Sequence, residues 1–210
     1  MCATKLLGAV LTAAPFFITT NATAAEDLAP CTHFADEYYR LVEARIRRAA
    51  PDVTLWQATV YPSSTQGEWS IRAIRMGDVY ELTIVRLDRS LWGTGWAKTR
   101  RNEFKRDLSS SPARARATTH RISARLFTQL ESVIRQSIEA ARVPHETSLA
   151  DALNLDDVLF RFEAAGSGCG ETRPLDWDET EAGKLAAIIL ALCNPSDENR
   201  IFRMLDELQD

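Results

Sequence analysis

The sequence predicts an α+β fold in which an antiparallel β-meander of four to six strands packs against two long helices and a buried C-terminal helix. Residues 54–87 contain three segments rich in β-branched and aromatic residues, separated by turn-forming residues. Residues 34–49 and 119–142 repeat apolar side chains at helical spacing, and the run ending near residue 193 is apolar on every side. These patterns together favour one sheet with one face against the helices.

The N-terminal segment has the layout of a cleaved export signal. A lone lysine precedes an apolar run from Leu6 to Ile18, and small residues ending at Ala24 follow it. The run is shorter than the roughly 20 apolar residues that a membrane-spanning helix needs. We expect cleavage of residues 1–24 near Ala24/Ala25, which leaves residues 25–210 as a single domain in the periplasm or outside the cell.

The first helix of this domain is expected at 34–49, where Thr32 can cap its start and Pro51 stops it. The three strands of the meander are expected at 54–62, 68–76 and 79–87. In the third strand Tyr80 and Leu82 would face one way and Glu81 and Thr83 the other.

The middle of the chain is harder to interpret. Residues 90–118 mix tryptophan, glycine, basic and serine-rich stretches, so we expect a short fourth strand around 96–106 followed by a loop. Apolar spacing then predicts a long amphipathic helix over 119–142 that lies across the sheet.

A β-hairpin and two helices are expected in the last third of the chain. Residues 158–164 form the first strand, Gly166-Ser167-Gly168 the turn, and Cys169 lies at the tip. A helix over 178–193 begins at an Asp-x-x-Glu signal and is too short to span a membrane. Ser196 can cap a last short helix.

Three cysteines follow the signal segment: Cys31, Cys169 and Cys193. Two of them should pair in an oxidising compartment. We favour a disulfide between Cys169 and Cys193, because a helix that climbs along the returning hairpin strand would bring them level. Without that geometry Cys31 becomes the partner of one of them, so the pairing stays open.

Charge is unevenly distributed along the chain, whose net charge is −4. Residues 86–125 carry eleven basic against three acidic side chains, whereas 146–210 carry five against fifteen. The two regions either neutralise each other in the fold or leave a basic binding surface exposed.

The basic region also holds the most unusual string in the chain, Trp-Gly-Thr-Gly-Trp, followed by a cluster of basic residues. Aromatic rings on a glycine-bearing loop can contact a partner or a sugar ring; alternatively both rings cap the open end of the meander. The residues we select as a candidate partner-binding surface are Trp92, Trp96, Arg100, Arg101, Lys105 and Arg106.

Catalytic and metal signatures are weak. Apart from His33, two residues after Cys31, no histidine lies near a cysteine or a second histidine, so no metal site and no cofactor are expected. The acids Asp176, Asp178, Glu179 and Glu181 are read as stabilising a helix start rather than as a catalytic or calcium-binding group.

The sequence therefore favours a non-catalytic binding module, and an inhibitor or immunity-type protein is one form of it. Its partner would be an envelope protein or an anionic envelope component, not a nucleic acid. The alternative is a small envelope hydrolase that uses carboxylates or Cys169 as a nucleophile.

Overall fold

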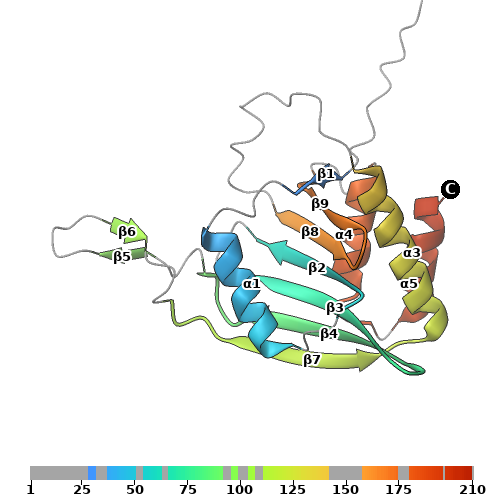
Figure 1. Cartoon of the computed structure of the whole chain (residues 1–210), viewed down its shortest axis with the longest axis horizontal. Helices are drawn as coiled ribbons and strands as arrows, with labels where there is room; N and C mark the ends of the chain where they lie inside the picture. Colours follow the sequence, from blue (N-terminus) through green and yellow to red (C-terminus); the bar gives the residue numbers. More distant parts are fainter. Residues whose placement is uncertain are drawn as a thin grey trace, which may run out of the picture.

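A computed structural model shows an antiparallel sheet with helices on both faces (Figure 1). The residues that it describes are 28–31, 37–50, 54–62, 66–91, 96–98, 104–106, 111–141, 158–174, 180–195 and 197–209. For 96–98 and 104–106 the description covers the backbone.

Seven of the described strands form the main sheet in the order β1-β9-β8-β2-β3-β4-β7, and the pairings between them are all antiparallel. Its strands are β1 (Ala29–Pro30), β2 (Trp56–Tyr61), β3 (Trp69–Met76), β4 (Val79–Leu87), β7 (Ala115–Arg121), β8 (Leu159–Ala164) and β9 (Gly168–Thr172). The α+β class and the antiparallel sheet are as predicted, and the sheet has seven strands where four to six were expected.

The predicted meander is β2, β3 and β4, and β7 extends it. Gly77, with φ of 61°, makes the tight turn between β3 and β4, a conformation that a side chain disfavours. Strand β7 occupies residues that were assigned partly to a loop and partly to the long helix. That helix, α3 (Ala124–Ala140), therefore begins later than expected, with the Ser123 hydroxyl accepting from the Leu126 N–H.

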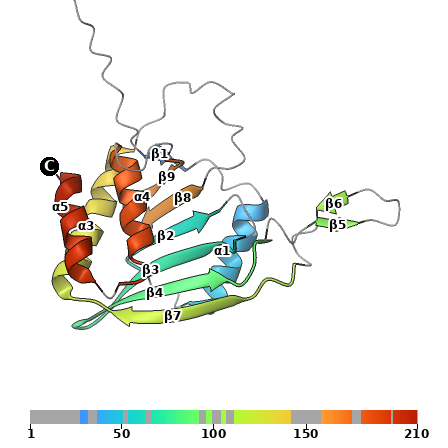
Figure 2. The ribbon, with the colours of Figure 1, turned by 180° about the vertical axis from the view of Figure 1, so that it is seen from behind.

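The helices lie on opposite faces of the sheet (Figure 2). On one face α1 (Glu37–Ala49) buries Val42 and Ile46 against Val85 and Leu87. On the other face lie α3, α4 (Glu181–Ala191) and α5 (Glu198–Gln209). We expected all helices on one face, and this was wrong because both alternating sets of side chains in β4 are buried.

The larger core lies between the sheet and the three later helices. Trp56, Phe160 and Phe162 from the central strands are at most 1% exposed, and Phe127 and Leu130 of α3 pack against them. Helices α3 and α4 run across the strands rather than along them (Figures 1 and 2). Among the described helices, none is long and apolar enough to cross a membrane.

Candidate functional site

The segment from Trp92 to Ser110, which we call the arm, contains all the residues selected from the sequence as partner-binding. It leaves the sheet after β4 and returns just before β7. Within it, β5 (Trp96–Lys98) pairs with β6 (Phe104–Arg106), and neither joins the seven-stranded sheet. Figure 1 shows this pair at the end of the molecule beyond α1.

Of the predicted partner-binding residues, Trp96 pairs with Arg106 across the two strands, and Lys105 pairs with Ala97. The structure describes the backbone of these three residues. Trp92, Arg100 and Arg101 lie outside the described residues. The candidate surface therefore stays a prediction.

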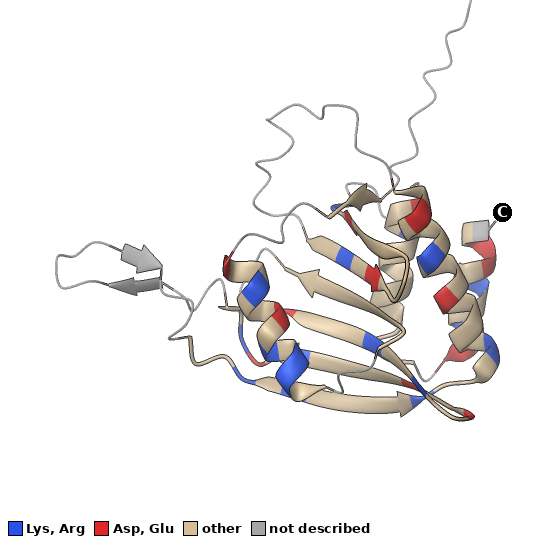
Figure 3. Cartoon of the chain, in the orientation of Figure 1, with Lys and Arg blue, Asp and Glu red and all other residues tan. Residues whose placement is uncertain are grey.

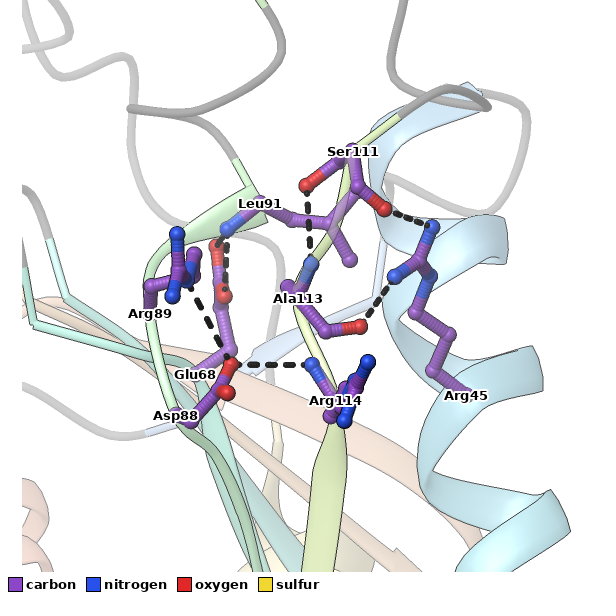
Figure 4. Close-up of polar contacts among 8 residues, drawn as sticks. All are labelled: Arg45, Glu68, Asp88, Arg89, Leu91, Ser111, Ala113 and Arg114. Carbon is purple, nitrogen blue, oxygen red and sulfur yellow. Dashed lines mark hydrogen bonds and ion pairs between the residues drawn. The ribbon is translucent and has the colours of Figure 1, made fainter.

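The start of the arm is held by Glu68, a carboxylate that is 0% exposed. Its two oxygens accept from the backbone N–H of Leu91, the last described residue before the arm, at 3.0 and 2.9 Å (Figure 4). The hydroxyls of Tyr38 and Ser90 donate to the same carboxylate at 2.7 and 3.2 Å. Hydrogen bonds to an ionised group are strong, and these satisfy a charge that would otherwise be costly to bury.

The end of the arm is held by Arg45 of α1. Its guanidinium donates to the carbonyl oxygen of Ser111 at 2.9 Å and to that of Ala113 (Figure 4). Ser111 and Ala113 are themselves buried. One face of α1 thus fixes both arm ends, since Tyr38 reaches Glu68 and Arg45 reaches the returning chain.

Asp88 joins the two ends to each other. Its carboxylate accepts from the backbone N–H of Arg114 at 2.9 Å and lies 3.7 Å from the guanidinium of Arg89 (Figure 4). The hydrogen bond from Arg114 lowers the pKa of Asp88, and the neighbouring guanidinium groups add to this. We call Arg45, Glu68 and Asp88, with the backbone groups they hold, the clamp.

A second polar cluster lies on the α1 face of the sheet. The buried Arg161 and the half-buried Glu163 of β8 form an ion pair of 2.6 Å, and the Gln57 amide donates to the same carboxylate at 2.7 Å. Burial raises the pKa of Glu163, and nearby Glu43 raises it further, while Arg161 lowers it. A hollow of about 610 Å³ opens beside Gln57 and Glu163 and reaches the disulfide at Cys169.

Glu43 of α1 lies beside this cluster. Its carboxylate is 7% exposed and accepts from the Tyr61 hydroxyl at 2.8 Å. Burial raises the pKa of Tyr61 well above its usual value, and the charge of Glu43 adds to the rise. The cluster thus combines one ion pair, Arg161 with Glu163, and one hydrogen bond from a neutral hydroxyl to Glu43.

The disulfide joins Cys31 to Cys169, with 5.7 Å between their Cα atoms. The expected Cys169–Cys193 bond was wrong. Strand β1 pairs with β9, which brings Cys31 beside Cys169. Helix α4 crosses the strands instead of climbing along one, so it carries Cys193 to Arg86 on β4. Four strand spacings, about 19 Å, separate β9 from β4.

Cys193 is a free, half-buried thiol. Burial raises its pKa, and the hydrogen bond with Arg86 partly opposes this. Cys169, being bonded, has no thiol with which to act as a nucleophile. Glu181 lies in the first turn of α4, whereas Asp176, Asp178 and Glu179 lie outside the described residues.

The clamp was not identified from the sequence because its partners are backbone groups far along the chain. Arg45 lies 66 residues from Ser111, and Glu68 lies 23 from Leu91. The cluster at Arg161 and Glu163 did carry a signal, since both alternate with buried phenylalanines in a predicted strand. That alternation placed two charges on one face of a central strand.

Within the described part of the chain, no cluster of histidine, cysteine and acidic residues could hold a metal ion. No protein-family model matches the sequence, and neither a curated protein nor a solved structure shows significant similarity to it.

Proposed function

We propose that this chain is an exported, non-catalytic binding protein whose arm makes the main contact with its partner. One observation carries the proposal: the buried Glu68 and the half-buried Arg45 fix the two ends of the arm, while among the described strands β5 and β6 pair only with each other. Binding segments commonly lie on loops that a rigid scaffold positions. A clamp of this kind reduces the conformational entropy that the arm loses on binding.

The composition of the arm indicates the kind of partner. Two tryptophans and several basic residues suit an acidic protein surface or an anionic envelope component, because tryptophan and arginine dominate binding energy at protein interfaces. An inhibitor or immunity-type protein acts in this way, through a surface that blocks another protein.

A pull-down from envelope extract tests this role of the arm. We expect the wild-type protein to retain a specific partner, and Trp96→Ala or the pair Arg100→Glu and Arg101→Glu to weaken binding by about 2 kcal/mol or more with little change in melting temperature. The matched control reverses two exposed charges of α1 instead, Arg40→Glu and Arg48→Glu. Equal loss in arm and control variants would contradict the proposal.

Export is the second part of the proposal, and the Cys31–Cys169 disulfide supports it because such bonds persist in oxidising compartments. We propose cleavage between Ala24 and Ala25, which leaves residues 25–210 as the mature domain. N-terminal sequencing of envelope-fraction protein should give Ala25 as the first residue. Full-length protein confined to the cytosol would contradict export.

A carboxylate-based hydrolase is the second candidate, favoured by the raised pKa of Glu163 beside a hollow of about 610 Å³. A carboxyl group of raised pKa suits general acid–base work. The hydrolase proposal predicts activity on envelope polymers that Glu163→Gln abolishes. Activity that survives this substitution would remove Glu163 from that role.

A further inference from the structure

Strand β7 ends the sheet with an open edge that differs from the opposite one. Helix α1 packs against Ala115 at the start of the strand, whereas the other six residues, 116–121, are exposed. Among the described strands it pairs with β4 alone. From residue 116 to residue 121, both faces and the outer edge of β7 therefore meet solvent.

The ladder with β4 shows which backbone groups point outward. Asp88 N–H donates to the Arg114 carbonyl at 3.0 Å, and Ile122 N–H donates to the Tyr80 carbonyl at 3.1 Å. Bonded and non-bonded pairs alternate along an antiparallel ladder. The even-numbered residues of β7 thus bond β4, while residues 115, 117, 119 and 121 direct N–H and C=O groups away from the sheet.

The other edge is protected in ways that β7 is not. Strand β1 has two residues, one of them Pro30, and the adjoining Cys31 is bonded to β9. Short strands, proline and bulges are the usual means by which sheets block further pairing. Strand β7 is seven residues long, has no proline, and keeps an unbroken register with β4.

Charge selects the kind of strand that this edge accepts. Arg114, Arg116 and Arg121 are exposed along it, and β7 itself contains no acid. The Arg121 side chain is 80% exposed beside Glu81. Figure 3 shows basic residues toward both ends of β7. A second copy of β7 would place like charges opposite each other, which destabilises a strand pair.

We propose that β7 binds an extended, acidic segment of a partner protein as an additional antiparallel strand. The odd-numbered residues supply the backbone hydrogen bonds, and the arginines pair with acidic side chains of the added strand. This contact is separate from the arm, so the binding of a strand to β7 can be measured even in a variant whose arm no longer binds its partner.

A synthetic peptide tests the proposal with the full mature chain. The probe alternates Glu and Val over about nine residues, long enough to cover the strand, and a Lys/Val peptide is its opposite. Fluorescence anisotropy should show binding of the acidic peptide that weakens with salt, because exposed charges are screened. The Lys/Val peptide should not bind.

Two substitutions at Ala117 separate backbone pairing from surface charge. Ala117→Pro removes one outward N–H without removing a bond to β4, and Ala117→Val keeps that N–H. We expect the proline variant to bind about tenfold more weakly and the valine variant to match wild type. Equal binding by the two variants would place the peptide elsewhere and overturn the proposal.

Charge reversal provides a second, independent variant that leaves the backbone intact. The double variant Arg116→Glu and Arg121→Glu should no longer bind the acidic peptide and should bind the Lys/Val peptide instead. This variant tests the proposal even if Ala117→Pro fails to fold. Unchanged peptide preference would overturn the proposal. So would a wild-type dimer that Ala117→Pro dissociates, because the edge would then pair with a second copy.

Discussion

The hydroxyl of Tyr38 and the carboxylate of Glu68 share a buried hydrogen bond of 2.7 Å, although they lie 30 residues apart. This bond couples α1 to the carboxylate that holds the start of the arm. We expect Tyr38→Phe to lower the free energy of unfolding by about 1 kcal/mol and Glu68→Gln by about 1 to 3 kcal/mol. Urea denaturation of the two variants and of the double variant measures the coupling. If the loss in the double variant equals the sum of the two single losses, Tyr38 and Glu68 do not stabilise each other.

Arg45 should be the most costly arginine to replace on α1. Arg45→Met removes the hydrogen bonds to the carbonyl groups of two buried residues, Ser111 and Ala113, and we expect the free energy of unfolding to fall by about 1 to 3 kcal/mol with faster amide exchange over residues 111–114. Arg48→Met, at an exposed position of the same helix, is the control and should change stability by less than about 0.5 kcal/mol. Similar losses in both variants would argue against the clamp.

The disulfide assignment predicts one crosslinked peptide pair, Cys31 with Cys169, in a non-reducing digest. Closing a loop of 138 residues should stabilise the fold by about 3 to 5 kcal/mol through the unfolded state. Cys31→Ser should show this loss, whereas Cys193→Ser should leave the crosslink intact. Recovery of a Cys169–Cys193 peptide would contradict the structure.

Glu163 and Asp88 should give opposite dependences of stability on pH. Burial raises the pKa of Glu163 above 4.5, so the folded state binds the extra proton and stability is lost as pH rises through the raised value. The Arg114 N–H lowers the pKa of Asp88 below 3.8, so its contribution is lost as pH falls through the lowered value.

Melting curves across this range should separate the two groups. Glu163→Gln should reduce the loss of stability seen as pH rises above 4.5. Asp88→Asn should reduce the loss of stability seen as pH falls below 3.8. Glu43→Gln should shift the Glu163 transition toward lower pH, because its charge contributes to the raised pKa. A profile of Glu163→Gln that matches wild type would show that another group controls this window.

Local patterns predicted the elements whose stabilising contacts are close in sequence. Strands β2 to β4 alternate large apolar residues around short turns, and α3 carries an unmistakable helical stripe. Strand β7, in contrast, has the sequence Ala-Arg-Ala-Thr-Thr-His-Arg, with no large apolar residue. Its strand conformation comes from pairing with β4, a non-local contact that no periodicity records.

The disulfide and the clamp depend on how elements cross in space. The direction of α4 relative to the strands decides whether Cys193 approaches Cys169, and the local pattern of α4 is the same in either direction. Similarly, Glu68 and Arg45 have the sequence signature of ordinary surface charges. Their roles follow from a neighbouring helix and from backbone groups that only the assembled sheet brings within reach.

The Cys31–Cys169 bond has a consequence for how the chain carries mechanical load. Tension applied between the two termini passes through the sulfur atoms and bypasses residues 32–168, which include β2, β3, β4, β7, β8 and α3. The disulfide thereby prevents the extension of up to roughly 480 Å of chain. Pulled from its ends, the oxidised molecule can yield by detaching β1, β9, α4 and α5, whereas the reduced molecule can unravel along its whole length.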